Sequence, residues 1–492
     1  MNLSGAVVAR PVRLAQAVVV LLLALKLWLT LTAPPIGDEA YYWMWGQKPG
    51  WSYLDHPPLH AWLLGLMSVF GWNHFALRLL TWLSFGGTLW IFRLWAQRLK
   101  PADPGAWFWP AAAIYLATPL FFLMSSIAFH DHLLIFLAIA SAHAFLTFAE
   151  KWEETGRGWA WLYGGAVLLG LAVLTKYNGV LLGVGFALFF LVVPKLRRLW
   201  LSPHLYLAAL LAVALQAPVL WWNLDAGLAS FNFHLAERWG RPLLQFQPGN
   251  FVRFVITTLV VVSPFLFPPL GRLLLRPPGT PFADRARALA LSVFAVSSLA
   301  MVGLSLFVEV FFYWNILAFL LLMPLVAGWF RHRWGAALHY GYGIFGAVLL
   351  TVNFSVVPVG NIFGFYDWTS SSSYGWEIAA PRVEALKRAQ GADFVVAARY
   401  TTAAQLGYAM HDADVVTIAD RHDQYDYWFD PAVHAGETAI IVSDSELGLG
   451  EIAPFFESVT PLEDISFDRF GIHIYTAQIY LGRGFTPAQR AE

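Results

Sequence analysis

The stretch Gly37-Asp38-Glu39-Ala40-Tyr41-Tyr42-Trp43, followed by Leu54-Asp55-His56-Pro57-Pro58-Leu59, is the most informative part of this sequence. It begins directly after an apolar segment that ends near Thr32. Carboxylates and a histidine are thereby placed at the end of a predicted membrane helix. Ionisable groups beside or inside a bilayer are energetically costly and usually have a function. The stretch therefore predicts a membrane protein that carries out chemistry.

The composition indicates that lipid replaces water around most of the chain. Of the 492 residues, 58% are hydrophobic and only 13% are charged, whereas soluble domains average about 25% charged residues. The formal net charge is zero, so nothing favours binding to nucleic acid. The chain has no cysteine, which excludes disulfides, thiolate catalysis and cysteine zinc sites.

Apolar segments account for most of the first 357 residues. A membrane-spanning helix needs about 20 mostly apolar residues. Segments of about this length lie near 14–32, 75–96, 106–124, 131–149, 159–175, 178–194, 203–222, 252–271, 287–307, 312–330 and 336–357. The fifth and sixth are short and meet at Lys176, which predicts a broken or tilted pair. Residues 58–70 are too short to span comfortably and are expected to form an interfacial or re-entrant helix.

The distribution of basic residues predicts the orientation of these helices. Short loops on the cytoplasmic side of a membrane carry an excess of lysine and arginine. With the N-terminus inside, every predicted inside loop is basic, and these loops contain Arg10, Arg13, Arg93, Arg98, Lys100, Lys151, Arg157, Lys195, Arg197, Arg198, Arg272, Arg276, Arg285, Arg287, Arg331 and Arg333. The acidic stretch around Asp38 is therefore expected to face outward, and so is the tail after Val357.

The tail differs from the rest of the chain. From residue 376 the pattern predicts a helix over 377–390, a strand over 394–398, a helix over 401–410, strands over 415–418 and 439–442, and an alternating run around 465–480. Alternating helix and strand patterns are typical of a small α/β domain. We therefore divide the chain into a transmembrane catalytic domain (1–358) with outer loops 33–74 and 223–251, a linker (359–375) and a soluble domain (376–492). Ser370 to Ser373 make the linker a candidate flexible hinge.

Asp38 is the first candidate for chemistry. A carboxylate in an outer loop can accept a proton from an attacking hydroxyl, provided that it lies within hydrogen-bond reach. Neighbouring tyrosines and tryptophans are typical of a membrane interface, and they favour a loop that is fixed at the interface over one that is freely solvated. The alternative is that the carboxylates merely end a helix in a solvated interfacial loop.

A second candidate group is His130-Asp131-His132, at the outer end between two predicted helices. The simplest alternative for Asp131 is a helix N-cap, because its carboxylate can accept backbone N–H bonds. The two histidines suggest a metal, although a His-x-His pair alone is weak evidence. Asp55, His56 and His234 are further candidate metal ligands, so a divalent metal ion is a candidate cofactor.

Cations in two other outer segments are candidates for binding an anion. Lys176 either extends to the lipid interface or pairs with a lipid phosphate as a point charge, and the break between helices favours the second. The loop after Trp222 carries Arg238 and Arg241, whose forked guanidinium groups suit a phosphate. The aromatic residues of that loop have an alternative role, which is simply to rest on the bilayer.

These segments together resemble the polytopic GT-C glycosyltransferases of the dolichyl-phosphate-mannose–protein mannosyltransferase type. Their bacterial relatives transfer aminoarabinose or galacturonic acid to lipid A. The matching segments are Asp38-Glu39-Ala40-Tyr41-Tyr42, Asp55-His56-Pro57-Pro58, His130-Asp131, Leu174-Thr175-Lys176-Tyr177, Trp222-Asn223, Trp314-Asn315 and Asp423-Gln424-Tyr425-Asp426-Tyr427-Trp428. The resemblance covers nearly the whole chain, and the shared order of the motifs makes it specific. It implies a polytopic α-helical membrane protein of about 11 to 13 transmembrane helices, with the GT-C fold and a small C-terminal α/β domain in the periplasm.

The resemblance also implies roles for individual residues. The catalytic candidates are Asp38, Asp131 and Glu39, of which Asp38 corresponds to the family's catalytic aspartate and Asp131 to its second acid. Glu39 is interpreted mainly as a support of the loop. The candidate substrate-binding residues are Tyr41, Tyr42, His56, Lys176, Tyr177, Asn223, Arg238 and Arg241. His56 and Tyr41 replace a phosphate-binding lysine and an arginine of the aminoarabinose transferases, and the other cations are expected to compensate. Asp55 stands where some relatives have a metal-binding glutamate.

The implied activity is transfer of a hexose or pentose from a polyprenyl-phosphate donor, with inversion at the anomeric carbon. The expected acceptor is an envelope glycolipid, lipid A or the lipopolysaccharide core, at the periplasmic face of the bacterial inner membrane. Arg399-Tyr400 and the tail tyrosines are expected to cover the site or bind the acceptor. Protein O-glycosyl transfer is the alternative within the fold. A polyprenyl-lipid transporter and a non-catalytic lipid-binding subunit are the rivals from other classes, although transporters usually show an internal repeat, which this sequence lacks.

Overall fold

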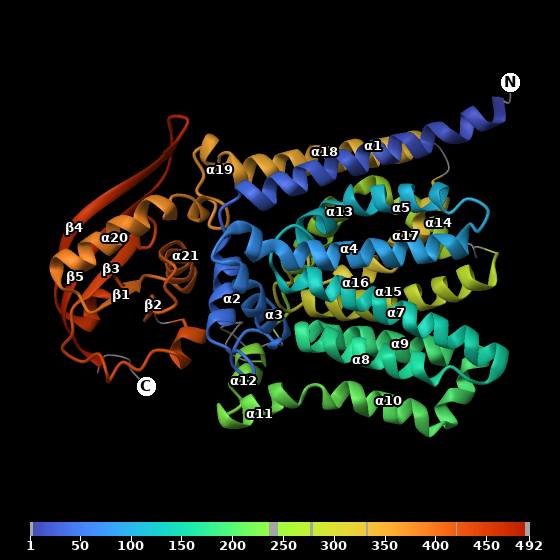
Figure 1. Cartoon of the computed structure of the whole chain (residues 1–492), viewed down its shortest axis with the longest axis horizontal. Coiled ribbons are helices and arrows are strands. Elements are labelled where there is room, and N and C mark those ends of the chain that lie inside the picture. Colours follow the sequence, from blue (N-terminus) through green and yellow to red (C-terminus); the bar gives the residue numbers. More distant parts are fainter. Residues whose placement is uncertain (1–2, 236–244, 276–278, 331–332, 420, 488–492) are drawn as a thin grey trace. The chain divides into compact units, whose positions relative to one another are not determined.

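The computed structural model describes residues 3–235, 245–275, 279–330, 333–419 and 421–487 of the chain (Figure 1). The chain divides into two compact units. The helical unit contains Met1–Leu27, His56–His60 and Leu80–Val348. The mixed unit contains Trp28–Asp55, Ala61–Leu79 and Leu349–Glu492. The outer loop after the first helix thus belongs mostly with the tail, which the division of the sequence at residue 358 does not anticipate.

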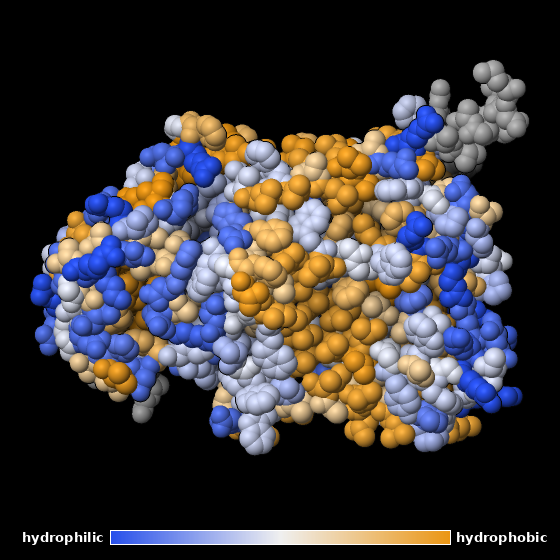
Figure 2. All heavy atoms as spheres, viewed as in Figure 1, coloured by the Kyte–Doolittle hydropathy of each residue, from blue (hydrophilic) through white to orange (hydrophobic). Residues whose placement is uncertain are grey.

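Long apolar helices build the helical unit. Its helices are α1 (Leu3–Thr32), α4 (His74–Leu99), α5 (Gly105–Leu116), α6 (Pro119–Met124), α7 (His130–Thr155), α8 (Trp159–Thr175), α9 (Val180–Val192), α10 (Pro203–Ala214), α11 (Ala217–Asp225), α12 (Ala229–Leu235), α13 (Pro248–Val262), α14 (Phe267–Leu275), α15 (Pro281–Ser305), α16 (Ile316–Leu320), α17 (Met323–Val326) and α18 (Arg333–Ser355). Three of these helices, α1, α4 and α18, continue into the mixed unit. Close pairs are α7 with α8, α9 with α15 and α8 with α10. Apolar side chains cover much of the visible face of these helices, as expected for contact with lipid (Figure 2).

Each predicted membrane segment is helical, but several are bent or short. In the described part of the chain, five helices are long and apolar enough to span a membrane, or eight when each of three bent pairs counts as one span. The bends are 110° after Val192, 45° between α10 and α11, and 77° between α13 and α14. The predicted break at Lys176 is confirmed, because this residue is extended between α8 and the 3₁₀ turn Tyr177–Gly179. Leu59–Phe70 forms a short apolar helix and turn, as predicted.

Ion pairs at one end of the helical unit test the predicted sidedness of the loops. Glu150 and Glu153 lie near the end of α7, and Glu150 pairs with Arg98. Arg285 contacts both carboxylates, at 3.3 and 3.0 Å, and Lys195 lies 3.4 Å from Glu153. These cations come from three different loops that the charge pattern places inside. Their convergence on α7 agrees with that assignment to a common side.

Short helices of the outer loop pack closely within the mixed unit. Helix α2 (Gly37–Gln47) lies against α3 (Leu59–Met67) and against α21 (Tyr400–Met410) of the tail. A Cβ atom on Gly37 would lie 2.7 Å from the side chain of Thr401, and one on Gly46 would lie 2.6 Å from the backbone nitrogen of Gly65. Glycine therefore allows α2 to approach both neighbours, which positions Asp38 one residue into the helix.

The tail folds as predicted into a small α/β domain. It contains α19 (Val359–Ile362), α20 (Trp376–Gln390), β1 (Phe394–Ala397), α21, β2 (Val416–Thr417), β3 (Ala439–Asp444), β4 (Phe456–Arg469) and β5 (Ile472–Phe485). The strand order is β2-β1-β3-β5-β4. Strand β1 is parallel to β2 and β3, whereas β5 is antiparallel to β3 and β4. The alternating run around 465–480 is therefore a hairpin of two long strands.

The serine-rich segment before this domain is ordered, so its prediction as a flexible hinge was wrong. Ser370, Ser371 and Ser373 are buried. The Asp367 carboxylate accepts hydrogen bonds from the backbone and hydroxyl of Ser370, and the Ser371 hydroxyl donates to Asn361. Serines that bond locally to backbone and side-chain groups can order a turn as well as loosen one.

Candidate active site

Asp38 lies in the first turn of α2, where it is part-buried and bonded to the tail. The Tyr400 hydroxyl donates a hydrogen bond of 3.2 Å to Asp38 Oδ1. Burial raises the pKa of Tyr400, and the negative charge of Asp38 raises it further. Tyr400 is therefore a proton donor in this contact. The carboxylate is held in a defined position, which a general base needs.

Asp55 forms the centre of a second network in the mixed unit. The Tyr41 hydroxyl donates to Asp55 Oδ2 at 3.2 Å and accepts a 2.8 Å bond from the backbone nitrogen of Gln424. Arg421 lies 3.6 Å from Asp55 Oδ1, with its guanidinium group stacked 4.2 Å from the Tyr400 ring centre. The network joins the first outer loop to the tail motif at Gln424, which the sequence resemblance singles out.

The aromatic residues of α2 fix these polar groups. Tyr41 is buried, and its ring lies 4.7 Å from Tyr400 and 5.9 Å from Tyr425, centre to centre. Burial, followed by the charge of Asp55, raises the pKa of Tyr41. Tyr42, also predicted to bind substrate, is buried with its ring against Trp45. Tyr42 thus has a packing role here, whereas Tyr41 contacts a candidate site carboxylate.

Glu39 has a different environment from its neighbour Asp38. It is completely buried, and its carboxylate accepts bonds of 2.9 and 2.6 Å from Arg78 and one of 3.1 Å from the backbone of Ile36. Arg78 also donates to backbone carbonyls, including that of Ala33 at 2.7 Å. The geometry makes Glu39 a support that joins the end of α1 to the start of α2.

Asp131 and Lys176 form a buried ion pair in the helical unit. The Lys176 ammonium group lies 2.9 and 2.7 Å from the two oxygens of Asp131 and 4.6 Å from the Tyr313 ring centre. The predicted alternative that Asp131 is an N-cap was wrong, because Phe129 is the N-cap of α7. The predicted alternative that Lys176 extends to the interface was also wrong, because its side chain is buried against Asp131.

Four histidines gather in the same unit. His60 and His132 approach through their Nε2 atoms at 3.2 Å, and His132 Nδ1 lies 3.0 Å from the Ser84 hydroxyl. The His130 ring lies 4.2 Å from that of His56 and 4.5 Å from that of His60, centre to centre. Ring packing therefore accounts for the position of His56, the residue that departs from the family pattern.

The remaining predicted residues have mixed outcomes. Asn223 is completely buried, and its side-chain amide bonds to the backbone of Val219 and Ser230 at 3.0 Å each. It joins α11 to α12, and its contact with substrate stays a prediction. His234 packs against the Tyr177 ring at 5.2 Å, beside Lys176 in the sequence. Arg238 and Arg241 lie outside the described residues.

The residues predicted to bind a metal ion do not come together as a metal site. In the described part of the chain, no three histidine or carboxylate side chains are arranged to hold a metal ion. Asp55 is engaged by Tyr41 and Arg421, and His234 by aromatic rings. These residues do not fit a metal, and no step below depends on one.

Comparison with known proteins shows the fold and a similarity of one segment to a known family. Residues 55–222 match the family model of dolichyl-phosphate-mannose-protein mannosyltransferases. The structure matches ArnT from Cupriavidus metallidurans in the apo state with a TM-score of 0.61, covering 97% of this chain and 98% of ArnT at 14% identity. The chain therefore has the GT-C fold, and about a third of it is similar to this mannosyltransferase family. The predicted fold class is thereby confirmed.

Two further relatives widen the comparison. ArnT bound to undecaprenyl phosphate matches with a TM-score of 0.60 at 16% identity, again over 97% of this chain and 98% of that one. The lipid A galacturonosyltransferase RgtD of Rhizobium johnstonii is 27% identical over 234 residues. That match spans 47% of this chain and 47% of RgtD, so about half of this curated relative is covered.

Several site residues were not found from the sequence. His60 follows His56 by one helical turn, and Arg421 belongs to a polar run directly before Asp423. The positions of both residues in the sequence could therefore have marked them as candidates. The link of Arg421 to Asp55 depends on how distant segments pack, and no spacing within the sequence records it.

Proposed function

We propose that this GT-C protein is an inverting glycosyltransferase that uses a polyprenyl-phosphate sugar as donor. The sugar is a hexose or pentose, and the acceptor is an envelope glycolipid such as lipid A or the lipopolysaccharide core. We place the reaction at the periplasmic face of the bacterial inner membrane. The observation that supports it most is the likeness over nearly the whole chain to ArnT, one structure of which holds undecaprenyl phosphate. The partial likeness to a lipid A galacturonosyltransferase supports a glycolipid acceptor.

In the proposed reaction, Asp38 is the general base. The acceptor hydroxyl oxygen attacks the anomeric carbon from the face opposite the phosphate, and Asp38 takes the hydroxyl proton as the new C–O bond forms. The bond from the anomeric carbon to the phosphate oxygen breaks, and its electron pair leaves with the polyprenyl phosphate. The configuration at the anomeric carbon is thereby inverted. Tyr400 orients the Asp38 carboxylate for this step through its 3.2 Å hydrogen bond.

The leaving phosphate gains negative charge and needs stabilisation more than protonation. We assign this task to Lys176, supported by Tyr177, and keep Arg238 and Arg241 as predicted contributors. Lys176 is preorganised by Asp131, which holds the ammonium group in place before the substrate binds. Asp131 is therefore proposed to position a cation rather than to take a proton.

Mass spectrometry of envelope glycolipids tests this function in cells. Cells that make the wild-type protein should contain a glycolipid larger by one sugar residue, and cells without the protein should lack it. Asp38→Asn should behave as the deletion does, at equal protein level in the membrane. Asp464→Asn, an exposed aspartate of β4, is the matched control and should behave as the wild type. Identical glycolipid profiles with and without the protein would contradict a glycolipid acceptor.

A further inference from the structure

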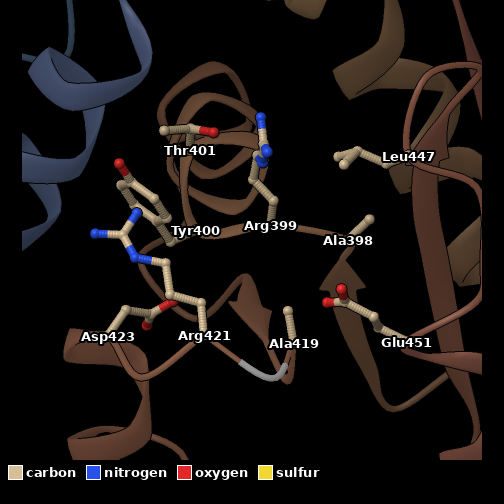
Figure 3. Close-up of a pocket in the computed structure, with 9 residues that line it drawn as sticks. All are labelled: Ala398, Arg399, Tyr400, Thr401, Ala419, Arg421, Asp423, Leu447 and Glu451. Atoms are coloured by element: carbon tan, nitrogen blue, oxygen red, sulfur yellow. The ribbon is translucent and has the colours of Figure 1, made fainter. Parts of the chain in front are cut away.

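A cavity opens at the carboxyl ends of the parallel strands in the mixed unit (Figure 3). The chain leaves β1 through α21 to reach β2 on one side, whereas β3 lies on the other side of β1. In open α/β sheets, ligands bind at such a switch in strand order, outside the carboxyl ends of the strands. The residues around the cavity come from the ends of β1 and β2 and from the segment after β3. They are Ala398, Arg399, Tyr400, Thr401, Ala419, Arg421, Asp423, Leu447 and Glu451.

The size of the cavity suits a single sugar unit with one substituent. Its volume is about 320 Å³, at the lower end of the range of about 300 to 1,000 Å³ for small-ligand sites. Arg421 and Glu451 lie on opposite sides of it, with Arg399 between them, and Arg421 lies beside Tyr400 (Figure 3). Polar groups on several sides of a small cavity are typical of a site that orients its ligand.

The charges around the cavity favour an anion. Arg399 and Arg421 contribute two guanidinium groups, which suit phosphate and carboxylate oxygens. Of the two carboxyl groups that line the cavity, that of Glu451 is exposed to solvent, and Asp55, which is not among the lining residues, offsets part of the charge of Arg421 at 3.6 Å. Burial raises the pKa of Asp423 to about 7, so this group carries only part of its charge near neutral pH. Helix α21 also begins here, and the first N–H groups of a helix have no partner within it.

The cavity shares two residues with the candidate catalytic group. Tyr400, which lines the cavity, donates to Asp38, and Arg421 lies 3.6 Å from Asp55. A ligand in the cavity therefore contacts Tyr400, which orients the candidate base, and Arg421, which stacks on Tyr400. This is the expected place for the substrate whose hydroxyl gives up a proton.

We propose that this cavity binds an anionic sugar of the acceptor, through a phosphate or carboxylate held by Arg399 and Arg421. The assignment to the acceptor rests on the proposed function, whereas the ligand class rests on the cavity and its charges. The donor phosphate has the same chemistry, so the test must separate the two sources.

Ligand-observed NMR on the full-length protein in detergent tests the proposal with N-acetylglucosamine 1-phosphate as the probe. The wild type should bind this probe at least about tenfold more tightly than uncharged N-acetylglucosamine, because a charged group accepts stronger hydrogen bonds. Arg399→Gln should weaken binding of the phosphate probe by about tenfold or more. Arg399 is chosen because Arg421 also contacts Asp55. Arg388→Gln, which removes an exposed arginine of α20, should bind as the wild type does.

Competition distinguishes the two phosphate sources. Undecaprenyl phosphate should not displace the sugar phosphate from the wild type. Displacement would overturn the proposal by assigning the cavity to the donor, and so would probe binding that is absent or insensitive to Arg399→Gln. The measurement needs no sugar transfer. A protein that binds the probe as expected but transfers no sugar would contradict the proposed function and leave the anion site in place.

Discussion

The Tyr400 hydroxyl donates a 3.2 Å hydrogen bond to Asp38, a residue 362 positions earlier in the chain. Through this bond the small α/β domain supplies a direct contact to the candidate catalytic carboxylate. The tail therefore contributes a residue to the candidate site in the mixed unit. This relationship leads to the first of the predictions below.

Tyr400→Phe should lower kcat by about tenfold or more and leave the KM for the donor nearly unchanged. The substitution removes the hydrogen bond to Asp38 but keeps the ring that packs against Tyr41. General-base catalysis contributes about 10² to 10⁴ in rate, and a misoriented base loses part of that. Steady-state kinetics on the purified protein check this. Tyr480→Phe in β5 is the control, and an equal loss of kcat in both variants would contradict the positioning role.

Lys176→Met should destabilise the protein by about 3 to 5 kcal/mol, because it leaves Asp131 buried without its cation. The double variant with Asp131→Leu should recover most of the loss, since neither charge then remains. Thermal unfolding in detergent measures both. Lys195→Met serves as the comparison, because this lysine is exposed and 3.4 Å from Glu153, and its loss should cost less than about 1 kcal/mol. Equal losses in the two single variants would rule out a preorganised buried pair.

Stability should fall as the pH rises from about 4 to about 7 through the titration of Asp423. Its pKa is about 7 in the folded protein, against 3.8 as the ordinary value, so the folded state binds the proton more tightly. The stabilising contribution is complete below the unfolded pKa and is lost as pH rises through the folded one. The full difference is about 4 kcal/mol. Asp423→Asn should remove this part of the pH dependence, and unchanged melting curves for the variant across that pH range would contradict the shift.

Gly46→Ala should destabilise the protein by about 1 to 3 kcal/mol through overpacking. The added Cβ would lie 2.6 Å from the backbone nitrogen of Gly65 and would force α2 away from α3. Gly86→Ala in α4 meets nothing within 4 Å, and should be neutral or stabilising because alanine is the better helix former. Melting temperatures compare the two. A Gly46→Ala protein as stable as Gly86→Ala would mean that the contact between α2 and α3 is looser than the structure describes.

Periodicity and composition were sufficient to place most of the elements. The helices and the first three strands of the tail fall within a few residues of their predicted positions, because each burial pattern is local, whereas the run predicted around 465–480 is part of two strands that begin at Phe456 and Ile472. The break at Lys176 was also visible, since two short apolar runs meet there. The bend at Ser263 was not predicted: this residue has a positive φ of 78° between α13 and the next turn, and serine carries no strong signal for that conformation.

Contacts between polar residues of distant segments could not be predicted from the sequence. Asp131 and Lys176 were each singled out, but nothing in their own segments indicated that they would pair. Glu39 was interpreted as a support of the loop, but its partner Arg78 was not predicted. Asn223 was selected by resemblance, and its amide is instead used by the backbone.

Sugar transfer by the purified protein tests the central claim most directly. The protein in detergent is mixed with a synthetic polyprenyl-phosphate sugar and an envelope glycolipid, and the glycosylated product and free polyprenyl phosphate are quantified. For the wild type and for Asp464→Asn, we predict that the glycosylated product and free polyprenyl phosphate form in equal amounts. For Asp38→Asn, we predict a transfer rate lower by about 100-fold or more, at unchanged folding. Full activity of Asp38→Asn would contradict the account, as would the absence of transfer by the wild type from every polyprenyl-phosphate sugar offered.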